Sequence, residues 1–127
     1  MNLTTYTNSN SRTRFVKCPE SHMRFNSKTG MVRFNAQAIK LLGLETGMQV
    51  QIHQREDDCQ WLLEIVKHDG LLIRIQPGDC AYFNNRFISR QVADSFEIDH
   101  GQSIRVEIEK IPVEEDGRYF YELNYYK

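Results

Sequence analysis

Residues 23–52 read MRFNSKTGMVRFNAQAIKLLGLETGMQVQI, and this stretch decides the fold. It begins with two short runs of β-type residues, 23–25 and 31–34. The turn between them ends in Gly30, because glycine reaches a positive φ at little cost. The pattern predicts a β-hairpin.

A short helix and another strand follow this hairpin. Asn35 can cap a helix over residues 36–42, and Gly43 is a typical residue for ending it. In residues 48–52, apolar and polar side chains alternate, which predicts a strand with one buried face. The unit is therefore strand, turn, strand, helix, strand.

The same order of elements recurs further along the chain, including a second Phe-Asn pair before a helix. Residues 73–76, 80–84 and 102–106 correspond to residues 23–26, 31–35 and 48–52. We interpret this as an internal duplication. The alternative is that any segment with this order of elements resembles any other.

Several further strands are expected. Trp61–Val66 is a run of β-type residues, and His68-Asp69-Gly70 predicts a hairpin turn into residues 71–75. Asp116-Gly117 predicts a turn into a last strand over residues 119–125, whose odd-numbered positions are apolar or aromatic.

A second helix is expected after residue 84. Asn84 or Asn85 can cap it, and Ile88, Val92 and Phe96 would form one apolar stripe at a spacing of four residues. The sequence thus contains about eight short strands and two short helices.

These elements predict a β-rich α+β fold, a small barrel-like domain built from two pseudo-symmetric β-β-α-β units with short helices. Residues 1–20 are expected to form a flexible basic N-terminal arm, because they contain few large apolar residues. Residues 21–127 are expected to be a single domain containing two repeats, at about 22–66 and 71–127. Neither half could bury its apolar face alone.

Composition narrows the functional classes. No apolar run approaches the roughly 20 residues of a membrane helix, and the polar N-terminus is unlike a secretory signal, so we expect a cytoplasmic protein without a membrane partner. Three cysteines and four histidines stand at spacings that predict neither disulfides nor a metal site. No nucleotide-binding or catalytic motif is present, so we expect no enzyme, no cofactor and no small-molecule substrate.

The charge is distributed unevenly although the net charge is only −1. Residues 1–40 contain seven basic residues and one acidic residue, whereas the remainder is acidic. This asymmetry favours a surface that meets a polyanion. The alternative is a solvated basic tail.

The hairpin and the segment Leu42-Gly43-Leu44 with Gly47 to Val50 resemble the swapped-hairpin DNA-binding domains of the AbrB, MazE and SpoVT type. Two such copies in one chain resemble the MraZ arrangement. The sequence departs from the family pattern at Phe34-Asn35, where the family has Ile-Pro.

This resemblance implies a non-enzymatic protein, a transcription regulator or antitoxin-like module, that binds double-stranded DNA. It implies DNA contacts by Arg24, Lys28 and Arg33 in the first unit and by Arg74 in the second. Arg86 and Arg90, near the start of the second helix, are added from their charge alone. Such side chains neutralise phosphates or read guanine edges.

The alternative is a structural or protein-interaction module, such as an assembly subunit, that does not bind DNA. The net charge of −1 and the acidic second part of the chain favour this alternative. The aromatic C-terminal strand is expected to belong to the core and the sheet edge, and it becomes a candidate partner surface if both its faces are exposed. A homodimer or another protein partner would then use that strand.

Overall fold

The computed structural model describes residues 20–76 and 80–125, which form ten strands and two helices. Residues 22–66 contain β1 (His22–Asn26), β2 (Met31–Phe34), α2 (Ala36–Leu42), β3 (Gln49–Gln54) and β4 (Trp61–Val66). The rest contains β5 (Leu71–Leu72), β6 (Arg74–Gln76), β7 (Cys80–Asn84), α3 (Arg86–Ser95), β8 (Ser103–Ile108), β9 (Val113–Glu115) and β10 (Arg118–Tyr125). The predicted N-terminal arm lies outside the described residues except for Glu20. No helix in the described ranges has the length and hydropathy needed to cross a membrane.

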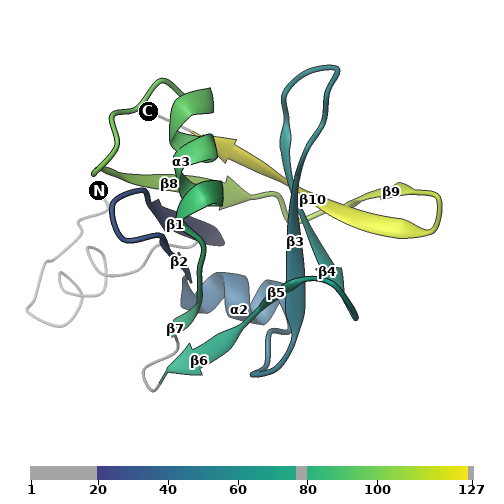
Figure 1. Ribbon diagram of the computed structural model, residues 1–127. Helices are drawn as coiled ribbons and strands as arrows, with labels where there is room; N and C mark the ends of the chain where they lie inside the picture. Colours follow the sequence, from purple (N-terminus) through teal and green to yellow (C-terminus); the bar gives the residue numbers. More distant parts are fainter. Residues whose placement is uncertain (1–19, 77–79, 126–127) are drawn as a thin grey trace, which may run out of the picture.

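All strands belong to one antiparallel sheet that curves into a nearly closed barrel (Figure 1). The strand order is β5-β3-β4-β10-β8-β1-β2-β7-β6, with β9 added to β10. The end strands β5 and β6 are joined through Ile73. The Ile73 N–H donates to the Met48 carbonyl at 2.8 Å, and the Gly47 N–H donates to the Ile73 carbonyl at 3.1 Å. One short segment therefore links both edges of the sheet.

The predicted barrel-like, β-rich fold is confirmed, but the hairpin expected between residues 61–66 and 71–75 is wrong. β5 pairs with β3 and not with β4, because the second edge of β4 is occupied by β10. The expected strand over residues 71–75 is also divided, since the chain leaves β3 at Ile73 and continues along β7. This division and the short β9 raise the number of strands from about eight to ten.

The helix ends follow their capping residues. The Asn35 side chain accepts a hydrogen bond from the Ala38 N–H at 2.9 Å, and Gly43 ends α2 in the left-handed conformation. Asn85, one of the two predicted caps, accepts from the Ile88 N–H at 2.9 Å. α2 begins just after β2 ends, and the Asn85 N–H binds the Gly30 carbonyl just before β2 begins. The helices therefore lie at opposite ends of β2 (Figure 1).

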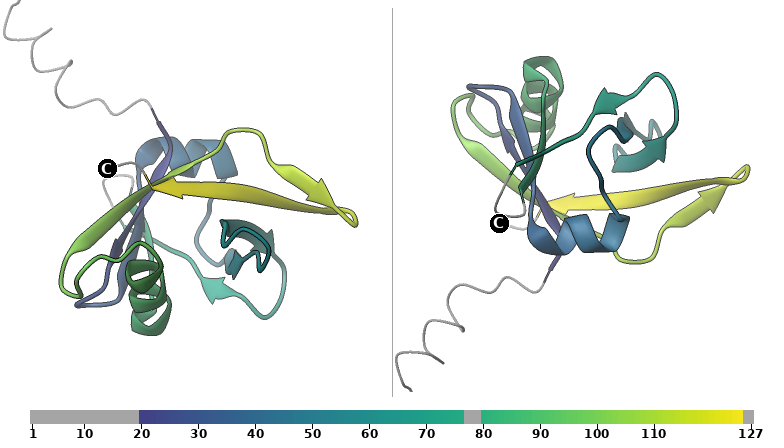
Figure 2. Two further views of the ribbon diagram at one scale, coloured as in Figure 1. Left: turned by 90° about the horizontal axis from the view of Figure 1, so that it is seen from above. Right: turned by 90° about the horizontal axis from the view of Figure 1, so that it is seen from below.

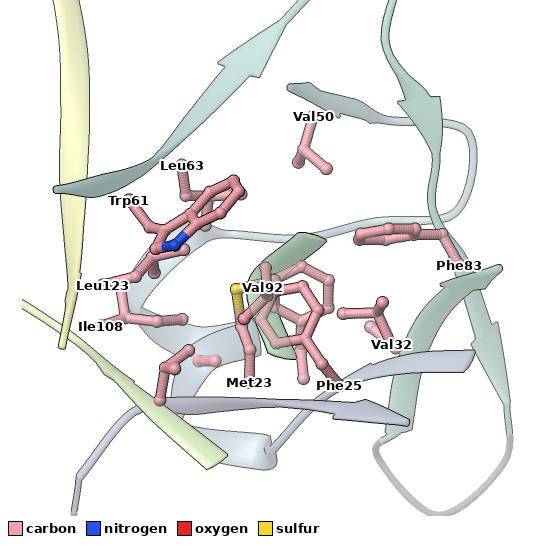
Figure 3. Close-up of a cluster of buried hydrophobic side chains, with 14 of the residues drawn as sticks. Met23, Phe25, Val32, Val50, Trp61, Leu63, Phe83, Val92, Ile108 and Leu123 are labelled. Atoms are coloured by element: carbon pink, nitrogen blue, oxygen red, sulfur yellow. The ribbon is translucent and has the colours of Figure 1, made fainter. Parts of the chain in front are cut away.

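The core fills the inside of the barrel (Figure 3). Buried and more exposed positions alternate along β1, β2, β7 and β8, whereas the first four residues of β4 are all buried. Buried core side chains on the strands are Met23, Phe25, Val32, Phe34, Val50, Trp61, Leu63, Ala81, Phe83, Ile104, Val106, Ile108 and Leu123. Each large one contributes about 1.5–3 kcal/mol by leaving water. α3 adds Val92, the central residue of the predicted stripe, while Ile88 and Phe96 are half-buried.

The hairpin of β9 and β10 projects away from the barrel as an arm (Figure 1 and Figure 2). At its root, Phe120 is buried and Tyr119 is exposed, so burial at this end of the strand does not follow the odd-numbered apolar positions. Phe120 packs on the outer face of β3 and β4, with its ring centroid 5.6 Å from that of His53 and 5.0 Å from the Arg118 guanidinium carbon. The sequence pattern missed this second packed surface.

Glu64 anchors the same root. Its buried carboxylate accepts hydrogen bonds from Arg118 Nε at 2.8 Å and Nη2 at 2.6 Å, and its Oε1 lies 2.9 Å from His53 Nε2. Hydrogen bonding by Arg118, followed by the contact with His53, lowers the pKa of Glu64 below its ordinary value of 4.5, although burial opposes this shift. The folded state therefore favours the ionised carboxylate.

Glu64→Gln should lower the free energy of unfolding at pH 7 by about 1 kcal/mol, because Arg118 is half exposed and its ion pair is screened. The stabilisation is present above about pH 4.5 and is lost as the pH falls through the lowered pKa, so the difference should shrink in acid. Urea unfolding at several pH values measures it. Glu56→Gln, an exposed control in the turn after β3, should change the free energy by less than about 0.5 kcal/mol. An unchanged difference at pH 3 would contradict this account.

Candidate nucleic-acid interface

Arginine side chains stand opposite one another on the outer face of the barrel. In β1, Met23 and Phe25 point inward, so Arg24 between them points outward. The register places Arg24 opposite Arg33 of β2 and opposite Arg105 of β8. Three exposed arginines therefore occupy neighbouring positions on three adjacent strands.

The series continues across two more strands. Arg33 is opposite Tyr82 of β7, and Tyr82 is opposite Arg74 of β6. We call the set Arg105, Arg24, Arg33, Tyr82 and Arg74 the arginine row. It crosses four strand spacings, about 19 Å along the sheet surface.

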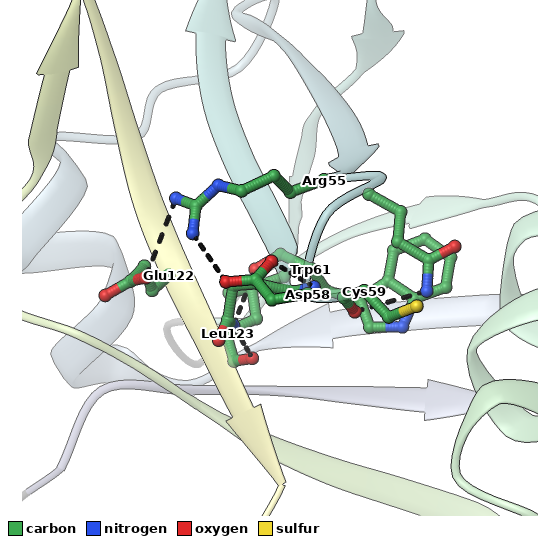
Figure 4. A network of polar contacts seen from close by, with 8 residues as sticks. Arg55, Asp58, Cys59, Trp61, Glu122 and Leu123 are labelled. Carbon is green, nitrogen blue, oxygen red and sulfur yellow. Dashed lines mark hydrogen bonds and ion pairs between the residues drawn. The ribbon is translucent and has the colours of Figure 1, made fainter.

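The row lacks the acidic partners that arginines in structural roles have in this protein. Arg55 lies 2.9 Å from Asp58 and 3.7 Å from Glu122, and these contacts connect the turn after β3 to β10 (Figure 4). By contrast, none of the four arginines of the row forms an ion pair with a carboxylate in residues 20–76 or 80–125. Like charges directly opposite each other on a sheet repel, so the row costs stability.

Burial and the neighbouring arginines together lower the pKa of His22. His22 lies two residues before Arg24 on the same outward face of β1. Its pKa is lowered from the ordinary 6.5 by burial first and then by the charges of Arg105 and Arg24, while Glu20 opposes the shift. The protonated, positively charged form of His22 is therefore disfavoured at this position beside the row.

A hollow of about 360 Å³ opens on the outer face beside the row, over β1, β2 and the start of β8. Its lining residues are Arg24, Asn26, Thr29, Met31, Arg33 and Ser103. The concave surface and the cations coincide here. It is therefore suited to an anionic ligand.

The other predicted residues form a second basic group at one end of the sheet. Lys28 is exposed in the turn between β1 and β2. Arg86 begins α3 directly beside this turn, since the position of a Gly30 Cβ would lie 2.7 Å from the Arg86 nitrogen. Arg90 is exposed one helical turn later. These three residues are outside the row.

Arg105 is the member of the row that the sequence prediction missed. The alternation of Ile104 and Val106 predicts that Arg105 points outward, but only the pairing of β8 with β1 brings it beside Arg24. That pairing joins segments about 80 residues apart. Sequence periodicity gives the face of a strand and not its neighbour.

Within the described ranges, no group of three or more His, Cys, Asp or Glu side chains is placed to hold a metal ion. Comparison of the chain with protein-family models, curated proteins and solved structures found no match. A functional assignment therefore depends on the geometry and charge of the chain itself.

Proposed function

We propose that this protein is a non-enzymatic, cytoplasmic DNA-binding protein, a regulator or antitoxin-like module, that binds double-stranded DNA through the arginine row. The observation that carries the proposal is the row itself: four arginines with no acidic partner among the described residues. Lys28, Arg86 and Arg90 would extend the contact beyond the end of the row.

Electrostatics favours a polyanion over a single small anion as the partner of the whole row. Each arginine can neutralise one phosphate and release its condensed counterion. A ligand with regularly spaced negative charges would also relieve the repulsion between the arginines, which no small anion could do across about 19 Å. Sheet strands are known DNA-reading elements.

The proposal includes a duplicated, interleaved architecture. Around the barrel, the hairpin of β1 and β2 is followed by the pair β7 and β6, then by β3 and β4, and then by β10 and β8. Hairpins from the first and second units thus alternate, as two swapped hairpin units would. Arg33 and Tyr82, which correspond in the repeat, also stand opposite each other. Both features support a pseudo-twofold relation.

A second candidate function is a protein-interaction module, and the projecting arm favours it. Tyr119 on β10 is 55% exposed, and Ile111 just before β9 is 84% exposed. Contiguous exposed apolar surface marks binding sites, so this candidate requires that the arm present such a surface to a partner. This function would use the arm and would not need the arginine row.

Fluorescence anisotropy with a labelled duplex at several salt concentrations tests the proposal. Four phosphate contacts predict a slope of about −3.6 for log affinity against log salt, so affinity should fall about tenfold between 0.1 and 0.2 M salt. Weak binding that does not depend on salt would refute DNA binding. The protein-interaction function would then become the leading one.

A further inference from the structure

The hollow beside the arginine row offers hydrogen-bond donors, and the side-chain oxygens of Asn26 and Thr29 already accept backbone hydrogen bonds. Asn26 Oδ1 accepts from the Lys28 N–H at 3.0 Å and from the Thr29 N–H at 3.1 Å. Thr29 Oγ1 accepts from the Met31 N–H at 3.3 Å. The Asn26 amide NH2 and the Thr29 hydroxyl hydrogen therefore remain as donors that no described residue occupies.

The two arginines add donors to the same space. Arg33 Nε donates to Met31 Sδ at 3.0 Å, which orients the guanidinium and leaves its terminal N–H groups available. Arg24 stands directly opposite Arg33, and no carboxylate lines the hollow. Opposite positions on paired strands are close enough for both guanidinium groups to contact one anion.

Hydrogen bonds hold the end of the hollow in place. Ser27 is fully buried; its hydroxyl donates to the Gln102 carbonyl at 3.2 Å and accepts from the Gly101 N–H at 2.9 Å. The Gly30 N–H also donates to the Asn26 carbonyl at 2.7 Å. These contacts connect the turn after β1 to the segment that enters β8, so little ordering is needed when a ligand binds.

We propose that this hollow binds one phosphoryl group and is the phosphate-anchoring subsite of the DNA interface. A phosphoryl group is tetrahedral, with two non-bridging oxygens in a DNA phosphodiester and three in a monoester. Donors that approach from the two arginines, the Asn26 amide and the Thr29 hydroxyl suit this arrangement better than they suit a planar carboxylate. The inference rests on the proposed function only for the source of the phosphate. A backbone phosphate of DNA and a phosphorylated small molecule share the same chemistry.

Asn26→Asp is the sharpest test of this subsite. Aspartate keeps the oxygen that accepts from the turn N–H groups, but it replaces the amide donors with a negative charge. Gln37→Glu makes the same charge change on an exposed residue of α2 and is the matched control. Inorganic phosphate and a labelled duplex are titrated separately into each protein, with amide NMR shifts and anisotropy as readouts.

In the wild-type protein, phosphate should shift the amides of Thr29, Met31 and Ser103 saturably, with a millimolar dissociation constant. Asn26→Asp should abolish these shifts and weaken duplex binding about eightfold, the effect of losing one phosphate contact at 0.1 M salt. Gln37→Glu should change either affinity less than twofold. Thr29→Val, which loses only the hydroxyl, should weaken phosphate binding about threefold, and unchanged distant amides verify the fold of each variant.

The possible failures separate the two proposals. The absence of saturable phosphate shifts, or equal shifts in Asn26→Asp, would overturn the subsite even if the duplex still bound. Saturable phosphate binding without duplex binding would support the subsite as one for a phosphorylated small molecule and would overturn the proposed DNA function.

Discussion

Replacing Arg24, Arg33 and Arg105 together with glutamine should weaken duplex binding by about 500-fold at 0.1 M salt, because each lost phosphate contact reduces affinity about eightfold. The slope of log affinity against log salt should become shallower by about 2.7. Salt-dependent anisotropy measures both quantities. The same variant should be at least as stable as the wild type, since it removes like charges that face each other across β8, β1 and β2.

The matched control removes three positive charges elsewhere. Lys40, Lys67 and Lys110 are exposed and lie outside the arginine row, so their replacement with glutamine changes the net charge equally. This control should weaken binding less than about fivefold. Equal losses in the two variants would mean that only net charge matters, and a destabilised arginine variant would mean that the row has a structural role. Either result would contradict the proposed interface.

Gly30→Ala should cost about 2–5 kcal/mol of the free energy of unfolding. Gly30 has φ +86°, and an added Cβ would lie 2.7 Å from the Arg86 backbone nitrogen and 2.9 Å from its Cα. The left-handed conformation costs about 1–2 kcal/mol for alanine, and displacement of the start of α3 adds about 1–3 kcal/mol. Urea unfolding measures the loss.

Gly43→Ala isolates the conformational part of that cost. Gly43 also has a positive φ, +63°, but nothing lies within 4 Å of its added Cβ. It should therefore cost only about 1–2 kcal/mol. Equal losses at the two glycines would show that the contact between the β1–β2 turn and α3 is loose.

Local chemistry explains which elements could be predicted from the sequence. The Asn35 side chain caps the start of α2, and the backbone of Gly43 adopts the left-handed conformation that ends it. Both properties belong to single residues, so both ends of the helix are as predicted. The hairpin predicted for residues 71–75 is wrong because their local pattern indicates a strand but not the strand with which it pairs. The partner depends on β10 having already taken the free edge of β4, which only the folded chain decides.

In the candidate site, too, single residues could be predicted from the sequence but their arrangement could not. Arg24, Arg33 and Arg74 were predicted singly, from a resemblance and their charge. Their alignment in one row with Arg105 is a property of strand register across five strands. The donor character of the hollow also depends on which atoms of Asn26 the turn uses, and composition does not contain that information.

The segment at Ile73, which joins the end strands β5 and β6, also affects how readily another molecule can add a strand to this sheet. The two end strands that this segment joins are short, with two residues in β5 and three in β6, and β3 continues beyond β5 for the four residues 51–54. Such short stretches are poor templates for a foreign strand. The tip strand β9 is equally short and carries Glu114 and Glu115, whose charges discourage a neighbour from adding there. Short end strands and a charged tip both limit edge-to-edge pairing between molecules of this protein.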